Sequence, residues 1–263
     1  MPEVLILSGI VILMVNHRFY WRARKQNKLP RFMAHRGIKT NSPENSLAAY
    51  QDAVDNGFEA IEMDIVSTHD GQLICSHNFD LERETTGSGW IHKINKKQLE
   101  PIKTGIYSHP NNSQSMPTFL DAVNQIPPHI FLNIEIKTHR IFDLSTAKAF
   151  IRFVQFDEIK QKFIISCFNP FVVAYFRLFH PKIPIGFLIQ DKQLLWLIHW
   201  IHPDFLHPRA DMVDDKIMDL SREHKLPLNI WTVNNLAAID WCCQNKIAGV
   251  ITDNPNALHR NPN

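Results

Sequence analysis

Three acidic residues occupy positions from which their side chains can converge on one metal ion. Glu62 and Asp64 lie in the apolar run AIEMDIV (60–66), and Glu135 lies in the run FLNIEIK (131–137). Both runs are rich in β-branched residues and predict strands. Because residues two apart on a strand point to the same face, Glu62 and Asp64 are expected to share one face.

These carboxylates would repel one another if they faced a common interior. Unpaired buried charges are costly in free energy, and a bound divalent cation would remove the repulsion. A set of oxygen ligands favours a hard ion, Mg²⁺ or Ca²⁺, over zinc. The sequence therefore predicts one divalent cation at Glu62, Asp64 and Glu135. In a purely structural alternative, the three residues form buried ion pairs with Lys137.

Two histidines and an arginine lie at neighbouring strand ends. His35 ends the run RFMAH (31–35) with Arg36 directly after it, and His77 ends the run LICSH (73–77). Imidazole titrates near neutral pH and can donate or accept a proton during catalysis. Together with the carboxylates, these residues favour an active site over a set of structural ion pairs.

From residue 31 onward, short β-rich runs alternate with helical stretches. The runs cover residues 31–35, 60–66, 73–77, 131–137, 162–168, 183–189, 203–208, 228–233 and 249–252. Helical stretches include residues 45–57, 144–156, 214–225 and 234–246. This alternation indicates βαβ units with parallel pairing and predicts an α/β fold of the (β/α)8 TIM-barrel type. The alternative is an open doubly wound sheet, but no G-x-G-x-x-G motif follows the first run.

In a barrel of this type the active site lies at the carboxyl ends of the strands, where the polar residues above are found. We expect the barrel to cover residues 31–263. Residues 80–115 are rich in glycine, proline and polar residues, and are long for a connection in a compact domain. They are therefore expected to form a small insertion at the barrel mouth.

Residues 1–30 form a hydrophobic and basic segment. The apolar run from Val4 to Val15 is followed by aromatic residues and five basic residues. As a helix the run would be about 18 Å long, short of a bilayer core of about 30 Å. The pattern is typical of an anchor with its basic flank on the cytoplasmic side. We therefore expect a cytoplasmic protein that this segment can attach to the inner face of a membrane. The alternative is a packed N-terminal helix.

Composition narrows the classes of partner. The net charge is +2, and the body of the chain has no dense basic run, which argues against a nucleic-acid partner. Four cysteines form no C-x-x-C pair, so we expect reduced, buried thiols and a reducing compartment. The histidines at 69, 92 and 139 are expected to be surface residues.

The order of several motifs resembles one known family. FMAHRG, PENS, EMD, HNFD and TTGSG are followed in order by MPTFLDAV, LNIEIK, ISCFNP, WTVN and GVITDNP. Over about residues 31 to 256 the chain resembles the glycerophosphodiester phosphodiesterase family. The hallmark order of that family, H-R, then E-x-D, then H, is met by His35-Arg36, Glu62-x-Asp64 and His77. Leu120 departs from the pattern, because the family usually has an acidic residue there.

The resemblance implies roles for eight residues, in three groups. The metal ligands would be Glu62, Asp64 and Glu135. The general acid–base pair would be His35 and His77, with the acid and the base not distinguished. The substrate-binding residues would be Arg36 and Lys137 for the phosphate and Trp231 for the glycerol part. Three alternatives stay open: Arg36 could pair with Glu44, Lys137 could merely neutralise the carboxylates, and Trp231 could be a core residue.

The resemblance implies hydrolysis of glycerophosphodiesters to glycerol 3-phosphate and an alcohol. The same site would serve a lysophospholipase D acting on membrane lysolipids, which the N-terminal segment would bring close. The substrate would thus be a small-molecule phosphodiester or a lysolipid. A third alternative is a binding protein built on an inactive barrel, but the intact histidines, carboxylates and cations argue against it.

Overall fold

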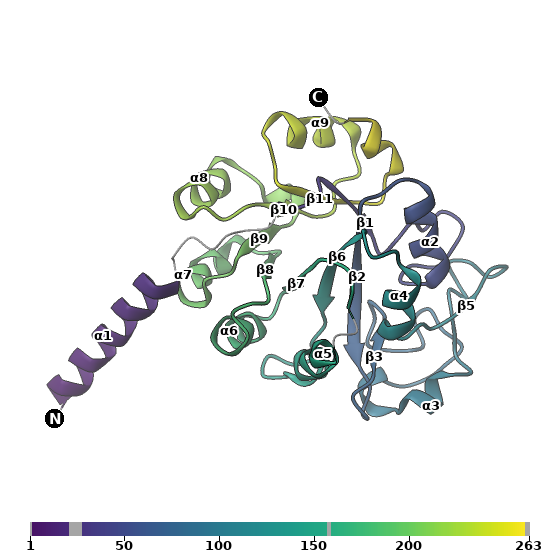
Figure 1. The fold of residues 1–263 in the computed structure, drawn as a ribbon, viewed down its shortest axis with the longest axis horizontal. Coiled ribbons are helices and arrows are strands. Elements are labelled where there is room, and N and C mark those ends of the chain that lie inside the picture. Colours follow the sequence, from purple (N-terminus) through teal and green to yellow (C-terminus); the bar gives the residue numbers. More distant parts are fainter. Residues whose placement is uncertain (1, 21–27, 157–158, 261–263) are drawn as a thin grey trace.

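The computed structural model describes residues 2–20, 28–156 and 159–260, and within it eight parallel strands form a nearly closed ring (Figure 1). The ring order is β10-β11-β1-β2-β6-β7-β8-β9. The strands are β1 (Phe32–His35), β2 (Ala60–Ser67), β6 (Phe131–Ile136), β7 (Phe163–Cys167), β8 (Ile185–Ile189), β9 (Phe205–Pro208), β10 (Asn229–Ile230) and β11 (Gly249–Thr252). Parallel bridges from Leu206 to Leu228 and from Arg209 to Trp231 connect the β9 and β10 ends of the ring. The predicted TIM-type barrel is confirmed.

Helices surround the ring and cover the outer face of its strands. They are α2 (Leu47–Asp55), α4 (Phe119–Gln125), α5 (Ser145–Gln155), α6 (Pro170–Phe179), α7 (Ile198–Ile201), α8 (Asp215–His224) and α9 (Leu236–Gln244). Short 3-10 turns add η2 (Lys192–Leu197), η3 (Ala210–Met212) and η4 (Pro255–Arg260). Polar caps begin several helices; for example, the Ser46 hydroxyl accepts from the Ala49 N–H at the start of α2. The strands are buried on both faces, as parallel strands between two layers must be.

The strand β3 (Leu73–Cys75) runs against the direction expected for it. It pairs antiparallel with β2, with Ile65 opposite Cys75, and lies outside the ring. Only residues 68–72 separate the two strands, whereas a parallel crossover needs a dozen or more residues. The run 73–77 is therefore the return arm of a hairpin, and its expected place among the parallel strands is wrong.

The insertion lies beside this hairpin and has a small core of its own. It contains η1 (Ile91–Lys93), α3 (Lys96–Leu99), β4 (Lys103–Thr104) and β5 (Gln114–Ser115). Its apolar residues, among them Leu81, Ile91 and Leu99, pack against Val66 and Ile74 of the hairpin.

Two histidines join the insertion to the barrel. His92 of the insertion stacks on His139 after β6 with ring centroids 4.0 Å apart, and both are partly buried. All three histidines lie at the surface as expected, with His69 exposed and the other two partly covered. The four cysteines, Cys75, Cys167, Cys242 and Cys243, are buried free thiols, as predicted.

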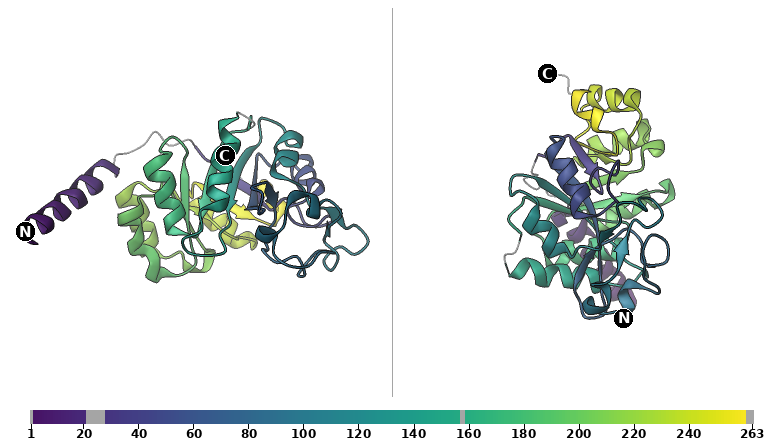
Figure 2. Two further views of the ribbon diagram at one scale, coloured as in Figure 1. Left: turned by 90° about the horizontal axis from the view of Figure 1, so that it is seen from below. Right: turned by 90° about the vertical axis from the view of Figure 1, so that its right-hand side faces the viewer.

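The N-terminal helix α1 (Pro2–Tyr20) projects from the barrel and approaches it near α7 (Figures 1 and 2). Its apolar side chains are open to solvent, with Val4, Leu5, Ile6 and Leu7 between 63% and 75% exposed. For these residues the alternative of a packed helix does not hold. Among the described residues, no helix is both long and apolar enough to cross a membrane.

The barrel should keep its stability without residues 1–28, because its packing begins at Leu29. Leu29 is buried against Met33 and Phe131 at the amino-terminal end of the barrel. We expect deletion of residues 1–28 to leave the midpoint of thermal unfolding unchanged within about 2 °C, a shift of at most about 1 kcal/mol. As a comparison, Leu29→Ala should cost about 2 to 5 kcal/mol in urea unfolding. A truncated chain that unfolds would show that α1 contributes to the packing of the barrel.

Candidate active site

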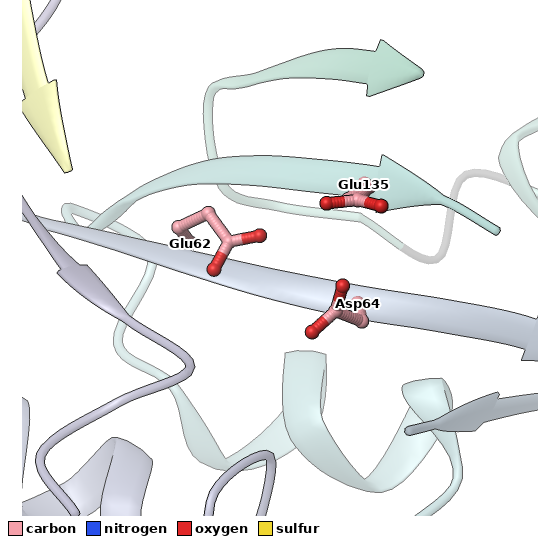
Figure 3. Close-up of side chains that lie close together, drawn as sticks. All are labelled: Glu62, Asp64 and Glu135. Carbon is pink, nitrogen blue, oxygen red and sulfur yellow. The ribbon is translucent and has the colours of Figure 1, made fainter. Parts of the chain in front are cut away.

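The side chains of Glu62, Asp64 and Glu135 point toward one another from β2 and β6 (Figure 3). The two strands pair in parallel with Asp64 directly beside Glu135. Exposed fractions are 3% for Glu62, 0% for Asp64 and 8% for Glu135. One oxygen from each carboxylate lies within 4.8 Å of the others. Met63, between the two acids on β2, belongs instead to the hydrophobic core. The alternation predicted from the two-residue spacing thus produces a convergent cluster.

The electrostatics of the cluster reflect burial and crowding of like charges. Burial raises the pKa of Glu62 well above its usual range, and the Asp64 and Glu135 carboxylates raise it further. Burial likewise raises the pKa of Glu135, although Lys137 opposes the shift. Burial also disfavours the charged form of Asp64, but Lys137 and Arg36 outweigh it and hold that pKa below its usual range. Of the three carboxyl groups, Asp64 has the lowest pKa and is the most readily ionised.

Arg36 is anchored by carboxylates on two sides. Its Nη1 donates to both oxygens of Glu44, at 3.0 and 2.9 Å, and its Nε lies 3.1 Å from Asp64 Oδ2. The backbone N–H of Arg36 donates to Glu62 Oε2 at 3.2 Å. The pairing with Glu44 that the sequence left open is therefore present, and the same guanidinium also contacts the acidic cluster. The next residue must be glycine, because a Cβ at Gly37 would lie 2.5 Å from a backbone oxygen of α2.

Lys137 neutralises part of the acidic cluster. Its Nζ lies 2.8 Å from Glu135 Oε1 and 3.5 Å from Asp64 Oδ1. Burial lowers the pKa of Lys137, but the carboxylates of Glu135 and Asp64 outweigh it and hold that pKa above its usual range. The ammonium group is thus held over the cluster, as the neutralising alternative requires, and it also lines the cavity described below.

The cluster fits a hard divalent cation. Asp64 Oδ1 is buried and accepts no hydrogen bond from the described residues. When all are ionised, Glu44 and the three clustered acids leave two negative charges in excess over Arg36 and Lys137. One divalent cation would balance that excess, and the donors available to it are oxygen atoms. Without a cation, protonation of Glu62 and Glu135 would have to remove the excess, in keeping with the raised pKa of both carboxyl groups.

Asn45 holds Asp64 in place, and sequence analysis missed it. Its Nδ2 donates to Asp64 Oδ2 at 2.9 Å, while its Oδ1 accepts from the Asp64 N–H at 3.1 Å and from the Tyr50 hydroxyl at 3.0 Å. Asn45 has a φ of +55°, a left-handed conformation that asparagine tolerates better than most residues. The PENS motif contains this asparagine, but the linear sequence does not show which side chain it contacts.

His77 reaches the site through the hairpin. β2 continues past Asp64, and β3 returns along it until the Ser76 N–H donates to the backbone oxygen of Asp64 at 3.1 Å. The next residue, His77, is thereby placed beside the acidic cluster. Burial lowers the pKa of His77 to about 4, and Lys137 and Arg36 contribute to the shift while Asp64 opposes it.

His35 lies at the end of β1 and meets a residue that the sequence analysis did not single out. Its Nδ1 is 2.9 Å from Asp253 Oδ1, directly after β11. Asp253 is also 2.7 Å from Lys39 Nζ. It stands in the GVITDNP motif, but its 218-residue separation from His35 hid the contact.

These residues share one cavity, here called the site cavity. It has a volume of about 250 Å³ and is lined by His35, Arg36, Glu62, His77, Glu135, Lys137, Phe168 and Trp231, among others. Trp231 is partly exposed, and its Nε1 donates to the His207 backbone oxygen at 2.8 Å. The Phe168 ring packs edge to face against the Trp231 ring, with ring centroids 5.3 Å apart. Trp231 therefore packs against the core on one side and faces the cavity on the other.

A second cavity, here called the adjoining cavity, opens between the insertion and the loop after β1. Its volume is about 360 Å³. Its lining includes Glu44, His77, Asp80, Glu84 and Ser108. Because His77 lines both cavities, they meet at that histidine.

Comparison with known proteins gives a consistent result. The sequence pattern of the glycerophosphoryl diester phosphodiesterase family matches residues 35–257. The glycerophosphodiester phosphodiesterase of Caldanaerobacter subterraneus subsp. tengcongensis is 26% identical over 235 residues, which cover 86% of this chain and 95% of the relative. A glycerophosphodiester phosphodiesterase of Bacillus subtilis is 24% identical over 253 residues, which cover 87% and 85% respectively.

Solved structures share the fold. A phosphodiesterase of Oleispira antarctica, in complex with the product sn-glycerol-3-phosphate, matches with a TM-score of 0.79 at 23% identity, over 88% of this chain and 96% of the other. The glycerophosphodiester phosphodiesterase of Thermotoga maritima matches with a TM-score of 0.71 at 19% identity, over 89% and 99%. The family pattern spans both histidines and all three clustered carboxylates. The chain therefore belongs to the glycerophosphoryl diester phosphodiesterase family.

Proposed function

We propose that this chain hydrolyses glycerophosphodiesters to glycerol 3-phosphate and an alcohol, with the help of a divalent cation. The observation that carries the proposal is the convergence of three buried carboxylates within 4.8 Å, in a cavity that two histidines also line. Family membership supports the reaction class, and the Oleispira antarctica relative was solved with one of the expected products.

Glu62, Asp64 and Glu135 would hold the cation, Mg²⁺ or Ca²⁺. When bound, it would polarise the phosphoryl oxygens and stabilise the charge that develops on them. Arg36 and Lys137 would bind the same phosphate. A phosphodiester is an anion that resists attack, and fixed cations in a partly buried cavity lower that barrier. Both side chains are already held in place by carboxylates, so little reorganisation would accompany binding.

His35 and His77 would carry the protons. One would take a proton from the attacking nucleophile, and the other would give a proton to the leaving alkoxide. Both imidazoles line the site cavity and come from different elements, His35 from β1 and His77 from the end of the hairpin. In this proposal they would act on opposite sides of one phosphorus atom.

The two cavities fit the two arms of a diester. The glycerol arm would lie in the site cavity against Trp231 and Phe168, where apolar faces can pack on its carbon chain. The alcohol arm would extend past His77 into the adjoining cavity, which the insertion helps to form. This placement explains why His77 lines both spaces.

A lysophospholipase D acting on membrane lysolipids is the second candidate. The observation that favours it is a group of exposed apolar side chains, Ile141 and Phe142 on the loop after β6 and Phe171 in the first turn of α6. Asn169 ties the two segments together by donating to the Ile141 backbone oxygen at 2.8 Å. These segments lie at the carboxyl end of the barrel, where an acyl chain could leave the site. The exposed apolar face of α1 would attach the chain to the inner face of a membrane, and its cytoplasmic location stays a prediction.

The metal role predicts that Glu62→Gln removes activity and weakens cation binding, because the substitution keeps the shape and deletes one charge. We expect hydrolysis of glycerophosphocholine to fall by at least about 10²-fold, since the cation contributes several kcal/mol of charge stabilisation. Glu100→Gln, at an exposed carboxylate of the insertion, is the matched control and should be unchanged. Full turnover by metal-stripped protein in excess EDTA would rule the assignment out.

The proton-transfer role predicts that His35→Ala and His77→Ala each lose at least about 10²-fold in rate with the fold intact. A substrate with a good leaving group, such as a nitrophenyl ester, needs no proton on its alkoxide. It should therefore restore the rate of whichever variant lacks the acid, and not of the other. If neither variant is slower on glycerophosphocholine, the histidines are not the acid–base pair.

The lysolipid candidate predicts that deletion of residues 1–28 separates two activities. The full chain should sediment with vesicles containing anionic lipid and lysophosphatidylcholine, and the truncated chain should stay in the supernatant. The truncated chain should keep its rate on soluble glycerophosphocholine and lose rate on the vesicles. Phe142→Ser should have the same selective effect, because it changes only an exposed side chain. Equal rate ratios in all three proteins would rule out the roles of α1 and Phe142, and no hydrolysis of lysophosphatidylcholine by the full chain would exclude the lysolipid activity.

A further inference from the structure

Asp253 connects His35 to Lys39, in the loop that follows β1, and to Asn234, in the loop after β10. Its Oδ1 lies 2.9 Å from His35 Nδ1 and 2.7 Å from Lys39 Nζ, and its Oδ2 accepts from Asn234 Nδ2 at 2.8 Å. A carboxylate held by three partners, two at the end of β1 and in the loop after it and one in the loop after β10, is fixed in one orientation. Nothing in the proposed chemistry so far uses it.

The backbone around Asp253 is fixed as well. Asn234 Oδ1 accepts from the Asp253 N–H at 2.8 Å, and the Asn254 side chain donates to the Asn234 backbone oxygen at 2.9 Å. Thr252 of β11 stands opposite Ala34 of β1, so the two strand ends that carry the carboxylate and the imidazole are neighbours in the barrel. The contact between His35 and Asp253 is therefore a product of the strand pairing.

We propose that Asp253 is a positioning residue for His35, fixing the imidazole with its proton on Nδ1 and its Nε2 free for the site cavity. The proposal rests on the proposed function of His35. An ionised carboxylate can only accept hydrogen bonds, so a neutral imidazole at this contact must carry its hydrogen on Nδ1. The unprotonated Nε2 is then the atom that can exchange a proton with substrate. Lys39 and Asn234 hold the carboxylate for this purpose and keep it ionised.

A positioning role and a purely structural role for Asp253 predict opposite rankings of two substitutions by their loss of activity. Asp253→Asn keeps the shape but has a single acceptor oxygen. When that oxygen stays with Asn234 and Lys39 turns away, the amide nitrogen faces Nδ1, donates to it and favours the hydrogen on Nε2, which is the unproductive tautomer. Asp253→Ala leaves Nδ1 to water and permits both tautomers. We therefore expect kcat to fall by about 10- to 100-fold for Asp253→Ala. It should fall further, toward about 10⁴-fold, for Asp253→Asn, with KM for glycerophosphocholine little changed in both. A structural role predicts that the alanine variant is the worse of the two.

The test measures kcat and KM for both variants and records the tautomer of His35 by nitrogen NMR on imidazole-labelled full-length protein. We expect the Nδ1–H form in the unsubstituted chain and the Nε2–H form in Asp253→Asn. Asp240→Asn, which alters another partly exposed carboxylate paired with an arginine, is the control and should change neither. In a His35→Ala background, Asp253→Asn should cause no further loss.

Three results would overturn the inference: an unchanged tautomer in Asp253→Asn, a larger loss in the alanine variant, or an added loss in the His35→Ala background. Failure of the proposed function gives a different result, because His35→Ala would then be as active as the unsubstituted chain. Circular dichroism and the midpoint of thermal unfolding identify any variant that fails to fold. The surviving variant and the double substitution still decide the outcome.

Discussion

The repulsion among three carboxylates buried on two paired strands governs the chemistry of this end of the barrel. Asp64 and Glu135 are opposite one another in the register of β2 and β6, so neither can withdraw without disturbing the sheet. Burial makes their charges costly and raises the pKa of Glu62 and Glu135. Ionising all three carboxylates therefore requires positive charge at this point. Arg36 and Lys137 supply part of it, and a divalent cation would supply the rest.

The rest of the site consists of residues that hold other residues in place. Asn45 holds Asp64 in place. Glu44 and Asp64 together hold Arg36, and the return strand of the hairpin positions His77. These supports come from loops at the carboxyl ends of several strands, while the strands provide a rigid base. Such a division is what allows one barrel to carry a precise arrangement of groups on otherwise variable connections. The proposed contact between Asp253 and His35 extends the same principle across the joint between β11 and β1.

The strands and the acidic cluster were predictable because they depend on local patterns, namely β-branched runs and a two-residue spacing. The family motifs added the histidines, but not the direction of β3, which follows from the short turn at residues 68–72. Asn45 and Asp253 were missed because they act on partners 19 and 218 positions away. No local pattern records such contacts. The stacking of His92 on His139 depends in the same way on how the insertion docks against the barrel.

The central claim, that the barrel holds a divalent cation between its three carboxylates, is tested most directly by locating the ion. Crystals of the protein with Mn²⁺, which takes the same oxygen ligands as Mg²⁺ and Ca²⁺, would reveal the ion by anomalous scattering. We predict one strong peak at about 2.0 to 2.6 Å from an oxygen of each of Glu62, Asp64 and Glu135. No peak between these residues at saturating Mn²⁺, or a peak only at another place, would contradict the account.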